Sequence, residues 1–293
     1  MKILKQKVKA FSGITHVLLA VLLFLLLMMF PIPFLNEYVA RLKSNIPLLF
    51  VSFIVLSGAS LLPDLDNDVS TAGFQLGFIG SIMTTFMKSI AQMIYSLYNL
   101  KGDRPPKSMH RLFWHTPFVG ILMIVFFWFK LPTGNLVFGE ALVAAYKNKS
   151  LISFILANLS GFILILLAFI SGHLGSNILL YWPLKLLPVG YRVKRIIEYL
   201  VPGFIFFYLF KATYTDLKFI GLSISLGYLF HIVGDAITKG SVPVIWPIPW
   251  KKQAWAKPRI LGPFQIETGG LVNMILNFVF LILNVILMYK LFL

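Results

Sequence analysis

Long apolar stretches separated by short polar segments run through the whole chain. The segment 74–100 is less apolar, carries Lys88 and Gln92, and is typical of an interfacial or re-entrant amphipathic helix. The other stretches approach the roughly 20 residues that a helix needs to cross a bilayer. They lie at about 14–33, 46–62, 115–131, 151–172, 196–211, 217–238 and 270–290. The pattern predicts an all-α, polytopic integral membrane helical bundle with about seven transmembrane helices.

Composition supports a membrane protein and restricts its chemistry. Hydrophobic residues make up 58% of the 293 residues and charged residues 12%, whereas a soluble domain is nearer a quarter charged. The first apolar run follows a basic segment but is followed by MMFPIPF rather than by a small-residue cleavage site. We therefore expect an uncleaved first membrane helix. The chain has no cysteine, which excludes disulfides and thiolate metal ligands.

The basic residues predict an orientation in the plasma (inner) membrane. If the N-terminus is cytoplasmic, most of the 26 lysines and arginines fall on the inner side, and the C-terminus lies outside. Positive-inside anchoring and contact with anionic membrane lipids account for the formal charge of +16. An anionic substrate is an alternative that charge alone does not decide.

In this topology all five histidines and four of the aspartates lie near the cytoplasmic ends of the predicted helices. The gathered residues are His16, His110, His115, His173 and His231, with Asp64, Asp66, Asp68 and Asp235. Ionisable groups at membrane depth are costly and usually functional. The orientation was derived from lysine and arginine alone, so this coincidence is independent evidence for a site.

The spacing of these residues favours a metal centre. His231 and Asp235 are four apart and share one helix face, and imidazole with carboxylate suits Zn, Mn, Fe or Ni. His110 and His115 can converge if the first lies in a loop and the second in the first helical turn. Alternatives remain for single residues: His16 or His173 can bind headgroups, and DLDND can be a solvated helix end. A calcium EF-hand is excluded, because Val69 and Gln75 stand where that loop needs Gly and Glu.

Four segments resemble the YdjM-like family of LexA-regulated, membrane-bound metal-dependent hydrolases. They are Thr15-His16, LLPDLDNDVS, HRLFWHT and GYLFHIVGDAITKGSVPVIWPIPW. The third departs from the family pattern HRGxTHS at Leu112, Trp114 and Thr116. The resemblance covers about 10–130 and 220–255, and we expect 132–216 to be an insertion within one membrane domain, 1–293.

The resemblance implies a metal-dependent hydrolase acting on an ester or phosphoester. We expect one or two divalent ions, Zn first, with Mn, Fe or Ni as alternatives. Asp66, itself a candidate ligand, and Arg111 are the candidate catalytic residues, since a guanidinium suits phosphate; for Arg111, positive-inside anchoring is the alternative. The candidate ligands are His16, Asp64, Asp66, His110, His115, His231 and Asp235.

A site at the headgroup plane favours an amphiphilic phosphoester such as a phospholipid or polyprenyl phosphate. The alternatives are a metal-binding transporter or sensor without catalysis, and a nuclease-like phosphodiesterase. A transport path should place ionisable residues near the middle of the membrane, and the centres of the predicted helices are apolar, which argues against a transporter. No specific nucleic-acid motif occurs.

Overall fold

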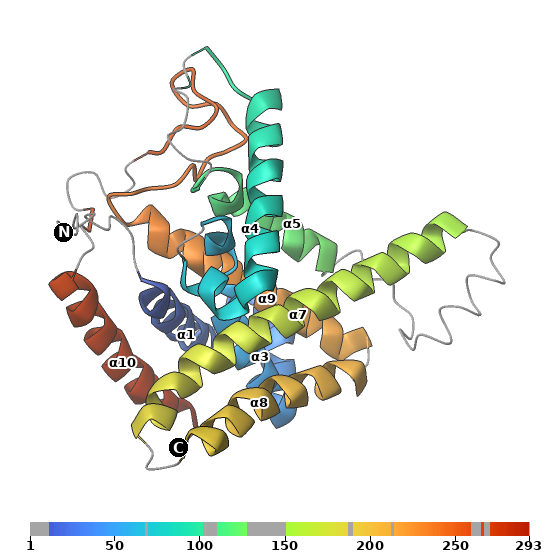
Figure 1. Cartoon of the computed structure of the whole chain (residues 1–293), viewed down its shortest axis with the longest axis vertical. Coiled ribbons are helices and arrows are strands. Elements are labelled where there is room, and N and C mark those ends of the chain that lie inside the picture. Colours follow the sequence, from blue (N-terminus) through green and yellow to red (C-terminus); the bar gives the residue numbers. More distant parts are fainter. Residues whose placement is uncertain are drawn as a thin grey trace. The chain divides into compact units, whose positions relative to one another are not determined.

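A computed structural model describes most of the chain. It covers residues 12–67, 70–101, 103, 110–127, 151–186, 190–211, 214–258, 265–266 and 270–292. These residues are helical with isolated β-bridges and contain no strand, so the all-α prediction is confirmed for the described chain (Figure 1). The described α-helices are α1 (Gly13–Met29), α2 (Asn36–Ser44), α3 (Ile46–Ala59), α4 (Thr71–Leu97), α5 (Pro117–Val125), α7 (Leu151–Leu186), α8 (Tyr191–Lys211), α9 (Tyr214–Ala236) and α10 (Gly270–Phe292). Short 3-10 turns are η1 (Pro33–Leu35), η2 (Pro63–Asp66) and η3 (Phe113–His115).

Three helical segments of the described chain are long and apolar enough to cross a membrane. They are Ile46–Asp66, Asp216–Ala236 and Gly270–Leu291, and a fourth span results if the pair Gly13–Met29 and Pro33–Ser44, bent by 92°, is counted as one. These agree with the spans predicted at 46–62, 217–238 and 270–290. Seven crossings are not confirmed. The spans predicted at 151–172 and 196–211 are not among these segments. At 115–131, α5 is short and the rest of the predicted span runs beyond residue 127, outside the described residues.

The chain divides into two compact units. One comprises residues 1–30, 60–120 and 228–293, and the other comprises 31–59 and 121–227. In the second unit, α3 and α7 cross at backbone contact distance. A Cβ added to Gly58 would lie 1.6 Å from the Ser171 carbonyl oxygen, and one added to Gly175 would lie 2.1 Å from that of Ile54. Small residues are what lets apolar helices approach this closely.

The first unit contains α1, α4, α10 and the last turns of α9. The side-chain amide of Asn284 on α10 donates to the Leu18 carbonyl of α1 at 3.0 Å. Most of the remaining surface of α10 is apolar and exposed, for example at Phe278 and Ile282. An apolar helix that buries only one face is expected to present the other faces to lipid.

The helix α4 is interrupted near its start and is amphipathic after the break. Gly77 has φ +55° and ψ −123°, a conformation that only glycine adopts readily. Beyond it, the buried positions recur with helical spacing and the opposite face is apolar but exposed. The buried positions are Gly80, Thr84, Met87 and Ala91, and the exposed ones include Phe78, Ile82, Phe86 and Leu97. The helix agrees with the amphipathic helix predicted at 74–100; its depth in a membrane stays a prediction.

An aromatic cluster joins the end of α4 to the loop after α9. The Trp246 and Trp255 rings stack with centroids 5.1 Å apart, and the Trp255 indole N–H donates to the Tyr98 carbonyl at 2.7 Å. The Asp103 carboxylate accepts the backbone N–H groups of Leu100, Ala254 and Trp255 at 2.7–3.2 Å. Both tryptophans are buried, so they pack inside the protein, whereas Trp250 and Ile248 of the same loop are exposed.

The break in α4 predicts a specific sensitivity at Gly77. Gly77→Ala should lower the free energy of unfolding by about 1–3 kcal/mol, because its backbone conformation is strained for any residue with a Cβ. An added Cβ would meet no atom within 4 Å, so steric contact is not the cause. Thermal unfolding in detergent measures the effect.

The matched control is Gly203→Ala in α8, where a Cβ also meets nothing within 4 Å but the backbone is helical. That change should be neutral or stabilise by up to about 1 kcal/mol. Equal unfolding temperatures for Gly77→Ala and wild type would contradict the interpretation.

Candidate metal centre

The candidate ligands meet within the first unit, where three helical segments end or begin. His16 lies in the first turn of α1, Asp64 and Asp66 lie in η2, and His231 and Asp235 lie in the last turns of α9. His110 and His115 come from the segment around η3. All of the residues predicted as ligands therefore lie in one unit. His173 lies in α7, in the other unit, where it contacts Asn177. Asp68 lies outside the described residues.

The last turns of α9 present His231 in a defined orientation. Its Nδ1 lies 2.7 Å from the Ser60 carbonyl oxygen. A carbonyl can only accept, so Nδ1 carries the proton and Nε2 has a free lone pair. That Nε2 lies 3.7 Å from Asp64 Oδ1 and 3.5 Å from Asp235 Oδ2. A backbone acceptor that orients a histidine in this way is a common feature of metal sites.

The turn η2 aims two aspartates at the histidines. Pro63 begins this turn, and its tight winding supplies the local twist that two carboxylates two positions apart need to face one place. Asp64 Oδ1 lies 3.9 Å from His115 Nε2, and Asp66 Oδ1 lies 3.5 Å from the same atom. Asp66 also lies 2.5 Å from His110 Nδ1. Asp66 is fully buried, whereas the Asp64 side chain is 19% exposed, so Asp64 is the carboxylate nearer to solvent.

A buried charge chain links Arg111, Asp235 and His115. The Arg111 guanidinium donates to Asp235 Oδ1 at 2.7 Å, and His115 Nδ1 lies 2.9 Å from Asp235 Oδ2. Burial opposes a positive charge on His115, and the carboxylates of Asp66 and Asp235 beside it offset that cost. Arg111 has φ +62°, an uncommon backbone for a long side chain. The sequence predicted that Arg111 contacts phosphate; with Asp235 as its partner, only its remaining N–H groups are available for that role.

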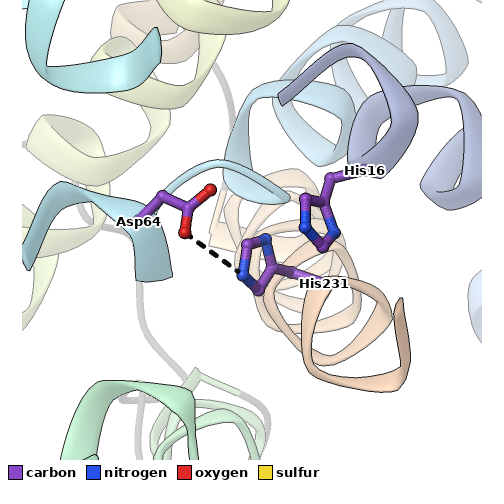
Figure 2. A group of neighbouring side chains, drawn as sticks. All are labelled: His16, Asp64 and His231. Carbon is purple, nitrogen blue, oxygen red and sulfur yellow. Dashed lines mark ion pairs between the residues drawn. The ribbon is translucent and has the colours of Figure 1, made fainter. Parts of the chain in front are cut away.

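His16 approaches α9 at a glycine. Its ring stacks on that of His231 with centroids 3.8 Å apart, and its Nε2 lies 3.6 Å from Asp235 Oδ1. A Cβ on Gly234 would stand 3.0 Å from His16 Nδ1, so glycine leaves the space that this ring occupies. Ser12 caps α1 by accepting the Thr15 N–H at 3.3 Å. Figure 2 shows the two rings face to face, with Asp64 directed at His231.

The donor set fits a divalent ion. Three groups place one ligand atom per residue within 4.8 Å of one another: His16, Asp64 and His231; Asp64, His110 and His115; and His115, His231 and Asp235. Donor atoms around a tetrahedral Zn²⁺ lie roughly 3.3–3.6 Å apart, close to the 3.5–3.9 Å between the facing nitrogen and oxygen atoms. Buried His115 Nε2, His231 Nε2 and Asp66 Oδ2 make no hydrogen bond within the described residues. Unpaired buried polar atoms are costly, and an ion would satisfy them.

Three contributors were missed by sequence reasoning. The Ser60 carbonyl orients His231 through backbone, which no side-chain pattern reveals. Gly234 lies in HIVGD, where an interior helical glycine is a visible sign of close packing. Lys257 is exposed, yet protein around its amine, together with Arg111, lowers the pKa of Lys257 to about 8. In the sequence it was one of several lysines in an aromatic loop.

The charge chain predicts that Arg111 supports metal binding through Asp235. Arg111→Ala should weaken Zn²⁺ binding by about 10–100-fold, the usual cost of losing a group that orients a ligand. Without the guanidinium, Asp235 loses one of the two partners that fix its position against His115. Competition with a chromophoric chelator on the detergent-purified protein measures the affinity.

Arg41→Ala is the matched control. Arg41 also donates to a largely buried aspartate, Asp216, at 2.9 Å, but in the other unit. Its loss should leave Zn²⁺ affinity unchanged. If Arg111→Ala bound Zn²⁺ as tightly as Arg41→Ala, Arg111 would have no supporting role.

Comparisons with known proteins identify the family. The family model described as YdjM inner membrane protein matches residues 11–292, nearly the whole chain and including all the candidate ligands. Comparison with curated proteins and with solved structures gives no match. The family predicted from the sequence motifs is thus confirmed, and with it a membrane protein. The chain belongs to the YdjM inner membrane protein family.

Proposed function

We propose that this protein is a membrane-embedded, metal-dependent hydrolase that cleaves a phosphoester in an amphiphilic, lipid-like substrate. The observation that carries the proposal is the buried histidine–aspartate cluster, in which His115 and His231 are oriented through Nδ1 and their Nε2 atoms receive no hydrogen bond from any residue that the structure describes. A structural network would be expected to pair these nitrogens, whereas a metal centre requires them free. The ion is proposed as Zn²⁺ first, with Mn, Fe or Ni as alternatives.

The chemistry requires an ion and a set of residues that positions the reactants. When bound, a divalent ion would supply a Lewis acid that polarises the phosphoryl group and makes hydroxide available at neutral pH. Asp64, the most exposed of the three carboxylates, lies on the side from which water and substrate would approach. Asp66 holds His110 by a 2.5 Å contact, and the His110 side chain is 22% exposed. This contact is suited to orient His110 as a ligand, as a supporting carboxylate does for a metal-bound histidine.

Positive charge near the ligands supports an anionic substrate. Lys257 lies close enough to Asp66, Asp235 and Arg111 for their charges to act on it, and its side chain is exposed. Its amine can attract a phosphate toward the carboxylate-rich centre, which would otherwise repel it. Arg111 can add its remaining N–H groups to the same anion.

The positions of the candidate ligands support a lipid-like substrate. Asp66 and Asp235 each fall at the end of a segment that can cross a membrane, Ile46–Asp66 and Asp216–Ala236. A site at helix ends is at the depth of lipid headgroups. The exposed apolar face of α4 in the same unit would contact acyl chains. We propose the cytoplasmic side of the inner membrane, which follows from the lysine and arginine distribution alone.

The proposal predicts metal-dependent hydrolysis by the purified protein. With Zn²⁺ or Mn²⁺ in nanodiscs, wild type should release phosphate or a phosphorylated headgroup from phosphatidic acid, phosphatidylglycerol or an isoprenyl monophosphate. Soluble glycerol phosphate should be a poor substrate. His231→Gln and His115→Gln should lose at least about 100-fold in turnover, since losing a ligand costs more than losing its supporting partner.

His173→Gln is the matched control, because this histidine lies in α7 outside the site and should retain full turnover. Metal-loaded wild type that released nothing from any of these lipids, while keeping its ion, would sink the hydrolase proposal. The alternative of a metal-binding membrane protein without catalysis would then be favoured.

A further inference from the structure

The cluster holds more ligands than one catalytic ion uses. A catalytic zinc typically has three protein ligands and an open position. Here four histidines and three aspartates converge, and nearly all are buried. They are His16, His110, His115, His231, Asp64, Asp66 and Asp235. The surplus raises the question of how the ligands divide.

The four histidines form two ring pairs, and Asp64 faces one member of each pair. His16 and His231 stack at 3.8 Å between ring centroids, and His110 and His115 meet edge to face at 4.8 Å. Each pair forms, with Asp64, a group whose ligand atoms lie within 4.8 Å of one another. These two groups share no histidine, while the third group joins His115 and His231 through Asp235, which already accepts from Arg111. Asp64 Oδ1 lies 3.7 Å from His231 Nε2 and 3.9 Å from His115 Nε2, facing one member of each pair.

The other carboxylates are engaged in orienting ligands. Asp235 uses one oxygen for Arg111 and the other for His115 Nδ1, and Asp66 contacts His110 Nδ1. With Ser60 on His231 Nδ1, three of the four histidines have an acceptor on Nδ1, and the Nε2 atoms of His115 and His231 face Asp64. Asp235 and Asp66 thus act as supporting groups of the carboxylate–histidine–metal kind, which leaves Asp64 as the carboxylate common to both pairs.

We infer that the cluster is a two-ion centre, with one ion held by His16, His231 and Asp64, the other by His110, His115 and Asp64, and Asp64 shared between them. Each ion has two imidazoles and one carboxylate, and keeps open positions for water and substrate. Ions about 3.5–4 Å apart can stabilise both the attacking and the leaving oxygen of a phosphoester. The inference rests on the metal centre of the proposed function and does not require hydrolysis.

The test is metal stoichiometry in half-site variants. Wild type, stripped by chelator and reloaded with Zn²⁺ in detergent, should hold two ions per chain by elemental analysis. His16→Gln and His110→Gln should each hold one, and the double variant none. His173→Gln should hold two. Each variant's elution profile and unfolding temperature, compared with metal-free wild type, establish that it is folded.

A second measurement is decided by wild type, so that variant folding cannot decide the outcome, and one variant then tests the shared ligand. Reloaded with Mn²⁺, the protein should give the electron paramagnetic resonance signature of an exchange-coupled pair. Asp64→Asn should replace it with the signal of isolated Mn²⁺. A single ion in saturated wild type without coupling would overturn the inference, as would loss of all metal in both half-site variants.

Turnover measured on the same samples separates this inference from the proposed function. If wild type bound one ion and hydrolysed a phosphoester, the hydrolase proposal would stand and the two-ion inference would be rejected. If wild type bound two coupled ions and hydrolysed none of the lipids, the two-ion inference would stand and the hydrolase proposal would be rejected.

Discussion

The buried carboxylate of Asp235 is the constraint on which the centre depends. A charged carboxylate removed from water needs partners on both oxygens, or its burial costs several kcal/mol. Arg111 and His115 provide them at 2.7 and 2.9 Å. To do so, Arg111 adopts a left-handed backbone, and its segment turns so that His110 and His115 both face η2. The position of His115 is thus tied to the neutralisation of Asp235.

Close packing sets how near the elements can come. Gly234 gives the His16 ring access to α9, and Gly13, where a Cβ would lie 2.9 Å from Thr71 Oγ1, brings the start of α1 against the start of α4. In the other unit, Gly58 and Gly175 allow α3 and α7 to touch through their backbones. In apolar helices, where water drives no association, such contacts are a main source of cohesion.

Sequence reasoning recovers the site better than the fold. HxxxD spacing places His231 and Asp235 on one helix face, and the clustering of ionisable residues at helix ends identifies the other candidate ligands that the structure brings together, because charge in an apolar chain has few explanations. Roles are harder to obtain. Arg111 lies in a basic segment, and only the structure shows that its side chain contacts Asp235. Likewise, hydropathy cannot distinguish aromatic side chains that face the membrane interface from those that pack against one another. Trp246 and Trp255 pack inside the protein. The number of membrane-spanning helices is the hardest feature to predict from the sequence, because short apolar segments such as α5 can pack without crossing a membrane.

The wide separation of the ligands along the chain has a consequence for biosynthesis. His16 leaves the ribosome long before His231 and Asp235, so the first helix enters the membrane carrying a polar turn whose partners do not yet exist. The last helix, α10, then packs on the first through Asn284 and Leu18. The cluster is therefore completed only after α9 has been synthesised, and an ion that needs all of these ligands would bind after that point. A truncated chain ending before α9 would retain five of the ligands and have no complete site.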